Sequence, residues 1–316
     1  MTTAGLPDAP RAGDPYARLG PHGGGAAVPG ACALVWVEGP DAASFLHGLL
    51  SNDIEGLAVG AVRCCLLLDG KGRIQADARV ARDGATAFTL VTWPHLGQVL
   101  ADALEHFHVS EDLDVLGPEP SDLVTVGGIQ PEGIQPEGIQ PEGASIPPDA
   151  AGVDLVLPGL VPGTLDLVVP DAAGAIDALG LPHAPGEALE ARRIEAGVPR
   201  VGIDTGPSTL VQEAGLEDVA VSFDKGCYLG QETVARVAYR GHVNRRLRGL
   251  CLPASASPGS TVSAGGRNMG RVTSVAKSPE RGWVALAMIR TSVATGACVE
   301  VDGVAGAGRV VTLPFP

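Results

Sequence analysis

The chain has 316 residues, of which 45% are hydrophobic and 18% charged, a balance typical of a folded globular protein with more than one domain. Its 22 basic and 36 acidic residues give a net charge of −14, which argues against non-specific binding to nucleic acid, because such binding requires a surplus of Lys and Arg. No apolar run reaches the ~18 residues of a membrane-spanning helix, so neither a nucleic-acid nor a membrane partner is predicted.

Six cysteines are present, and none of their spacings is typical of a zinc site, an iron–sulfur cluster or a disulfide framework. The N-terminal sequence lacks the charged-then-apolar order of a signal peptide. We therefore expect reduced thiols and a cytoplasmic location. His106 and His108 have the spacing of two ligands on one strand, but no third ligand accompanies them and no metal site is predicted.

The first part of the chain predicts strands and helices in alternation after a disordered lead-in. Residues 1–28 are rich in Gly, Pro and Ala and are expected to be disordered. Strands are expected at residues 31–38, 61–69, 72–82 and 87–93, and helices at 42–53 and 94–107. The turn at residues 69–72, Asp-Gly-Lys-Gly, joins two of these strands as a hairpin. This order predicts an α+β fold with a mostly antiparallel sheet.

Residues 128–143 contain the pentapeptide GIQPE three times. A period of five residues matches no helix, strand or solenoid unit, and the Pro and Gly of each copy prevent a sustained helix. We predict an expanded surface loop without catalytic chemistry. A tract that binds a partner is the alternative.

The second part of the chain predicts a change of architecture near residue 243. Two strands, at residues 153–159 and 164–170, precede helices at 171–180, 186–197 and 232–240. From about Val243 onward, short strand-like segments alternate with Gly, Pro and Ser, which is typical of a small antiparallel barrel. The predicted domains are an α+β region at residues 29–242 and a C-terminal β-barrel at 243–316.

The segment DKGCYLGQE, residues 224–232, holds the densest group of reactive side chains. Lys225 precedes Cys227 by two residues and a helix is expected just after it, and both features favour a thiolate. Gly226 and Gly230 allow a tight backbone path and close approach of a ligand. Spacing alone leaves a nucleophile, a ligand and a buried structural cysteine open for Cys227.

Basic residues are concentrated just after this segment. Between residues 225 and 248 they outnumber the acidic ones six to one, the members being Lys225, Arg236, Arg240, Arg245, Arg246 and Arg248 against Glu232. A solvated charged face is one explanation. In an acidic protein such a stretch also suits an anionic ligand, and we expect an arginine such as Arg236 to face one.

Two carboxylates occupy unusual positions. Glu195 lies near a predicted helix C-terminus, where the helix dipole disfavours it. A carboxylate there can accept two parallel N–H bonds from the 2-amino-imine edge of a pterin or guanine, although an exposed helix end is the ordinary outcome. Asp77 lies in a predicted strand, where Asp is depleted.

The string KGCYLGQE, followed by VAR and preceded by RRIEAGVP, resembles the YgfZ family of folate-binding proteins, relatives of the aminomethyltransferase (T-protein) of the glycine cleavage system. Supporting stretches lie at residues 39–54, 66–80 and 270–290, so the resemblance covers roughly residues 30–310. It implies a GcvT-like α+β folate-binding region, made of antiparallel sheets with helices around a central channel, and a small C-terminal antiparallel β-barrel.

The resemblance also implies tetrahydrofolate, or a one-carbon derivative of it, as the ligand. The implied role is assembly or repair of iron–sulfur clusters, with iron–sulfur enzymes or cluster-assembly proteins as partners. Residues matched to a catalytic role are Cys227, Lys225 and Asp77, the last at or beside the catalytic aspartate of the T-protein. Residues matched or assigned to cofactor binding are Asn52, Asp53, Glu195, Tyr228, Gln231 and Arg236, with Glu195 at the pterin-binding glutamate.

Two departures weigh against an aminomethyltransferase. Ala76 replaces a second Asp of the T-protein, and Cys227 has no counterpart there. The alternative function remains a folate-dependent aminomethyltransferase or demethylase, with Asp77 as the acid–base group and Cys227 structural. A scaffold with a vestigial pocket is a third possibility.

Overall fold

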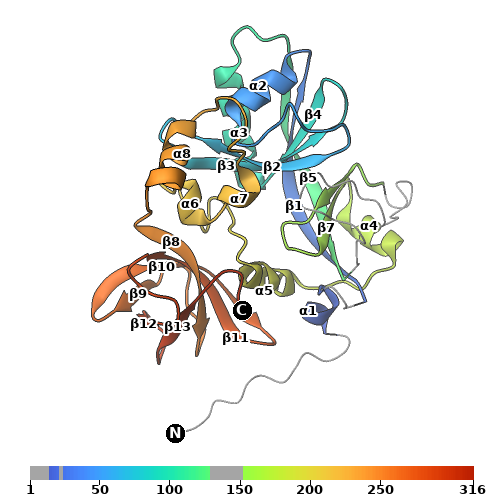
Figure 1. The fold of residues 1–316 in the computed structure, drawn as a ribbon. Coiled ribbons are helices and arrows are strands. Elements are labelled where there is room, and N and C mark those ends of the chain that lie inside the picture. The colour runs from blue at the N-terminus through green and yellow to red at the C-terminus, as the bar shows by residue number, and fades with distance from the viewer. Residues whose placement is uncertain (1–13, 21–23, 129–151) are drawn as a thin grey trace.

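The structure is a computed structural model that describes residues 14–20, 24–128 and 152–316. Of the predicted GIQPE loop, only Gly128 is among them. Figure 1 shows a twisted sheet with helices at one end of the molecule and a separate barrel at the other, with helix α5 between them. None of the helices in the described ranges is long and apolar enough to cross a membrane.

The larger body is built on a seven-stranded antiparallel sheet with the order β2-β3-β4-β1-β5-β7-β6. Its strands are β1 Ala26–Glu38, β2 Val62–Leu68, β3 Ile74–Arg82, β4 Ala87–Thr92, β5 Asp114–Gly127, β6 Leu155–Pro158 and β7 Thr164–Val169. The predicted hairpin between β2 and β3 is confirmed. Alternation along β3 places Ile74, Ala76 and Ala78 in the core, and Gln75, Asp77 and Arg79 on the other face.

Helices cover the sheet and connect it to the barrel. They are α1 Pro15–Arg18, α2 Ala42–Leu49, η1 Pro94–Leu96, α3 Gly97–Phe107, α4 Ala172–Leu179, α5 Gly186–Ala196, α6 Val211–Ala214, α7 Glu217–Ala220 and α8 Gln231–Arg240. Leu46 of α2 and Leu100 and Leu104 of α3 pack into the same core as strands β1 to β4. Helix α5 ends as predicted at Gly197, which has φ 75°.

The C-terminal part closes into a six-stranded barrel with the order β10-β11-β8-β13-β12-β9. Its strands are β8 Arg245–Leu252, β9 Thr261–Ala264, β10 Arg267–Ser278, β11 Gly282–Arg290, β12 Cys298–Val301 and β13 Gly308–Val311. Apolar side chains such as Leu250, Val272 and Val310 fill its interior. The predicted fold class, α+β with a small antiparallel barrel at the C-terminus, is confirmed.

The structure differs from the sequence-based expectations at the start of the chain and at strand β5, and helix α2 is shorter than expected. Residues 15–18 form α1 and β1 begins at Ala26, whereas residues 1–28 were expected to be disordered. The side chain of Tyr16 is buried against α5 and the barrel, a contact that composition does not reveal. Strand β5 was not predicted, because Pro118 and Pro120 interrupt its pattern; a register shift in the paired strand at Leu34/Trp36 accommodates them.

Candidate functional site

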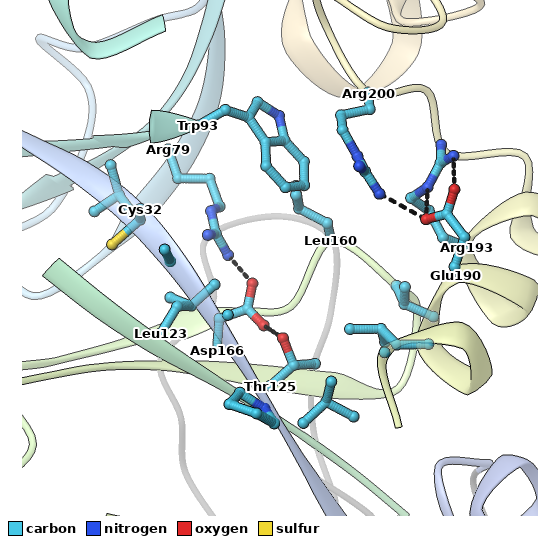
Figure 2. A pocket seen from close by; sticks show the side chains of 18 of the residues that line it. Cys32, Arg79, Trp93, Leu123, Thr125, Leu160, Asp166, Glu190, Arg193 and Arg200 are labelled. Carbon is cyan, nitrogen blue, oxygen red and sulfur yellow. Dashed lines mark hydrogen bonds and ion pairs between the residues drawn. The ribbon is translucent and has the colours of Figure 1, made fainter. Parts of the chain in front are cut away.

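A cavity of about 220 Å³ lies between the sheet and the start of α5. Figure 2 shows its polar lining, in which side chains from β3, β5 and β7 point toward those from α5. The polar and aromatic residues that line it are Asp77, Arg79, Thr92, Trp93, Thr125, Asp166, Glu190, Arg193 and Arg200. Several groups that bind hydrogen-bonding ligands therefore meet in one cavity.

The floor of the cavity is a buried ion pair between Arg79 and Asp166. The Arg79 guanidinium also donates to the carbonyl of Pro158 at 3.0 Å. The second oxygen of Asp166 accepts from the Thr125 hydroxyl at 2.6 Å. Because each charge has a partner, the pair tolerates burial and presents a fixed polar surface to the cavity.

Asp77 supplies the free acceptor of the cavity. Its Oδ2 accepts from Trp93 Nε1 at 3.3 Å, and its buried Oδ1 has no partner among the described residues. Burial raises the pKa of Asp77 to about 6. The carboxyl group can therefore accept or donate a hydrogen bond near neutral pH.

Replacing Asp77 with Asn is expected to raise the free energy of unfolding at pH 7.5 by about 1–3 kcal/mol. The raised pKa means that the folded state binds this proton more tightly than the unfolded state. Ionisation thus lowers stability as the pH rises from about 4 to above 6. Urea denaturation at pH 7.5 and pH 4.5 measures the effect. The gain should shrink at pH 4.5, and an equal gain at both values would contradict the assignment.

The opposite wall of the cavity belongs to α5 and the loop after it. Glu190 pairs with Arg193 at 2.7 Å and with Arg200 at 2.6 Å. The Arg200 guanidinium lies 5.1 Å from the centre of the Trp93 ring. Arg200 Nε has no hydrogen-bond partner within the described ranges, so this side chain has a donor left for a ligand.

Cys227 lies apart from this cavity, in an exposed position at a shallow groove of about 680 Å³. The loop around it is fixed by Gly230, which has φ 83° and where a Cβ would lie 2.5 Å from the carbonyl oxygen of Asp69. Helix α8 then begins at Gln231. The thiol is therefore accessible and carried by a well-defined turn.

Lys225 does not point at the thiol as expected. Its ammonium group donates to the carbonyls of His47, Leu50 and Asn52 at the end of α2, the last two at 2.7 and 2.9 Å. Burial lowers the pKa of Lys225 to about 8, while the three acceptors match its three protons. The side chain anchors the loop of Cys227 to α2, which is a positioning role.

Asn52 and Asp53 support the same anchor and do not line the cavity. Asn52 donates to the carbonyl of Cys64 at 2.9 Å. Asp53 accepts from the backbone of Gly56 at 3.0 Å and lies 3.2 Å from His47. Both side chains are engaged in the turn after α2, so they shape the approach to the loop of Cys227.

Tyr228 and Gln231 are also structural parts of this loop. Tyr228 is buried, with the Lys225 ammonium 5.1 Å from its ring, and burial raises its pKa to about 12. Gln231 donates to the carbonyl of Gly226 at 3.3 Å. Both residues line the groove beside Cys227, and neither lines the cavity.

Two predicted ligand residues lie elsewhere in the structure. Glu195 accepts a hydrogen bond from the Tyr16 hydroxyl and lies 3.8 Å from Arg281, so it holds α1 and the barrel against α5. Arg236 is exposed on α8 and lines neither site. On the α5 side the cavity is lined by the carboxylate of Glu190 and the guanidinium of Arg200, and ligand binding by Glu195 and Arg236 stays a prediction.

Sequence analysis also missed Arg79, Asp166 and Arg193. A usable signal existed for Asp166, since it is a charged residue in the otherwise apolar segment TLDLVV, and such residues need a partner when buried. Its partner Arg79 lies 87 positions earlier in the chain, and only the sheet brings the two together.

The fold defines a class of protein. The structure matches that of the glycine cleavage system aminomethyltransferase T from Bartonella henselae with a TM-score of 0.79 and 22% identity, over 96% of this chain and 88% of that one. Residues 245–315 match the family model of the glycine cleavage T-protein C-terminal barrel domain. The chain thus has the fold of the aminomethyltransferases.

Sequence comparison shows similarity to YgfZ proteins. The chain is 30% identical over 220 residues to the tRNA-modifying protein YgfZ of Edwardsiella ictaluri, covering 66% of this chain and 65% of that protein. It is 28% identical over 227 residues to the tRNA-modifying protein YgfZ of Serratia proteamaculans, covering 68% and 67%. The chain is thus similar to YgfZ proteins, and the alignments span 65% and 67% of the length of these two relatives.

Proposed function

We propose that this protein binds tetrahydrofolate, or a one-carbon derivative, and uses the thiol of Cys227 to support assembly or repair of iron–sulfur clusters in client enzymes. The observation that carries the proposal is the exposed Cys227 on a loop held by Lys225. The three hydrogen bonds from the Lys225 ammonium group to carbonyl oxygens hold this loop, and with it the thiol, in a fixed position. The similarity to YgfZ proteins supports the folate-related part of this proposal. A cytoplasmic location belongs to this proposal.

The cavity fits the pterin end of a folate. A pterin presents N–H donors that carboxylates accept, and Asp77 has a free oxygen for this purpose. The Trp93 indole offers an aromatic surface beside it, and Arg200 has a spare donor for an anionic part of the ligand. In this proposal Asp77 and Arg200 bind the ligand within the cavity, which Glu195 and Arg236 do not line.

Cys227 would act from its own groove as a thiolate, which is the form that attacks electrophiles and binds metals. The client's cluster, a one-carbon adduct or a client disulfide are the partners that this thiol can engage. A single cysteine cannot hold a cluster alone, so a client must supply the other ligands. The relatives are named tRNA-modifying proteins. That name is compatible with this proposal if one of the client iron–sulfur enzymes acts on tRNA.

Tetrahydrofolate is expected to raise the melting temperature by about 5 °C at a concentration 100 times its Kd, because a ligand that binds only the folded state stabilises it. Leu160→Trp should abolish the shift, since Leu160 lines the cavity. The control is Val219→Trp on α7, where the side chain is 61% exposed. If neither the parent protein nor the control responds to tetrahydrofolate, the folate part of the proposal is wrong.

The raised pKa and free oxygen of Asp77 favour a second candidate, a folate-dependent aminomethyltransferase or demethylase. Asp77 would then exchange a proton with the amine or the folate. Incubation of an aminomethyl donor with tetrahydrofolate should yield methylenetetrahydrofolate, ammonia and the donor group in its protonated form, and Asp77→Asn should abolish that yield. Absence of product from the parent protein would remove this candidate.

A further inference from the structure

The charges of this protein are strongly segregated between its two parts. Residues 243–316 contain nine of the 22 basic residues of the chain but only three of its 36 acidic residues. The barrel is thus basic, and the rest of the chain has a net charge more negative than the −14 of the whole protein. Such asymmetry points to an anionic partner for the basic part.

The basic barrel contributes to a groove of about 910 Å³, bounded by residues 202–209 and strands β8, β10 and β11. Arg271 and Arg290 are exposed and line it, and neither has an ion-pair partner in the part of the chain that the structure describes. In the strand register, Arg290 is opposite Arg245 and Arg271 is opposite Met288. All four side chains therefore project from the same side of the barrel.

Arg245 and Arg290 lie directly opposite each other, and like charges in this position destabilise a sheet unless one of them is neutralised. Arg245 is paired with Glu213 at 3.0 Å through two of its nitrogens. Asp204, the other carboxylate of the groove, is bound by Arg193 at 2.8 Å. Both acidic residues are thus neutralised, and the charges of Arg271 and Arg290 are left for a ligand.

Thr205 gives a second indication of a ligand. Its side chain is 3% exposed and lines the groove, yet its hydroxyl has no hydrogen-bond partner among the described residues. Buried polar groups are normally satisfied. The side chains of Asn244 and Asn268 line the same groove and add hydrogen-bonding capacity around the arginines.

We propose that this groove binds the phosphodiester backbone of a single-stranded RNA segment. Arginine forks match phosphate oxygens in bidentate geometry. The groove lining contains no aromatic side chain on which a base could stack, so its contacts are to phosphates alone and carry no sequence information. The acidic remainder of the protein does not prevent this, because charges more than ~8 Å apart are largely screened at physiological salt. The proposal is independent of Cys227 and of folate.

The test uses the whole chain and a fluorescently labelled 12-nucleotide RNA, with anisotropy measured between 50 and 200 mM salt. The double variant Arg271→Ala/Arg290→Ala should weaken binding at least tenfold at 50 mM salt. It should also reduce the slope of log K against log salt by about 1.4, because each phosphate contact on a single strand contributes about 0.7. Thr205→Val should weaken binding severalfold, without the change in slope.

The matched control is Lys277→Ala/Arg309→Ala, which removes two exposed charges from the same barrel outside the groove. Equal weakening by this control would show diffuse attraction and overturn the site. Adenosine monophosphate is the competitor: displacement of the RNA at a concentration near the Kd of the RNA would make the groove a free-nucleotide site and overturn the strand proposal. Absence of RNA binding by the parent protein at 50 mM salt would also overturn it.

Discussion

Arg193→Ala is expected to lower the free energy of unfolding by about 3–5 kcal/mol, because it leaves the buried carboxylate of Asp204 without its cationic partner. The guanidinium is 4% exposed and donates to Asp204 at 2.8 Å, to Glu190 at 2.7 Å and to Ser274 at 2.8 Å. Ser274 belongs to strand β10 of the barrel, so this single side chain connects α5 with both parts of the molecule. Its loss leaves Asp204, whose side chain is fully buried, without its cationic partner.

Urea denaturation followed by circular dichroism measures this effect. Arg246→Ala is the control, since Arg246 makes a 3.3 Å ion pair with Glu217 at a side-chain exposure of 40%, and exposed pairs contribute roughly 0–1 kcal/mol. Arg193→Lys keeps the positive charge but not the planar guanidinium. Its loss in the free energy of unfolding should therefore lie between those of Arg193→Ala and Arg246→Ala. A loss for Arg193→Ala no greater than that of the control would show that this network does not hold the parts together.

Cys227→Ser is expected to abolish support of iron–sulfur enzymes while leaving the fold and folate binding intact. The thiol is exposed, so its replacement should not disturb the core, and a serine hydroxyl of similar shape does not form a thiolate. Complementation of a strain deficient in iron–sulfur enzyme activity, with client activity as the readout, measures the effect. The tetrahydrofolate thermal shift of the same variant should equal that of the parent protein.

Cys298→Ser is the matched control, because Cys298 is the other exposed cysteine and lies on the barrel strand β12. It should complement fully. Full complementation by Cys227→Ser would refute the thiol role, even if tetrahydrofolate binding is confirmed. Failure of both serine variants would indicate a general loss of function and would likewise count against a specific role for Cys227.

Most of the secondary structure could be predicted from local signals. The hairpin turn at residues 69–72 and the helix stop at Gly197 depend on neighbouring residues alone. Strand β5 could not be predicted in this way. Its prolines conflict with strand propensity, and the strand exists because β1 and β7 pair with it on both sides.

The candidate sites likewise divide into features that depend on adjacent residues and features that depend on contacts between distant segments. The motif around Cys227 was found because its members are adjacent in sequence, and the structure keeps them in one loop. Asp77 was found from its unusual place in a strand, but its partner Trp93 was not. A helix position near the C-terminus does not determine which neighbour the Glu195 side chain faces, and its partner Tyr16 lies 179 positions earlier in the chain.

Sequence by itself determined the class of fold, the barrel after residue 243, and the segment that carries the reactive thiol, because each follows from hydrophobic periodicity, turn residues or a contiguous motif. Only the tertiary structure decided which charged groups meet. It separated the cavity of Asp77 from the groove of Cys227, turned Lys225 toward α2, and brought Arg271 and Arg290 together beside Thr205. The physical reason is that burial and pairing of charges depend on contacts between strands and helices that are distant in sequence.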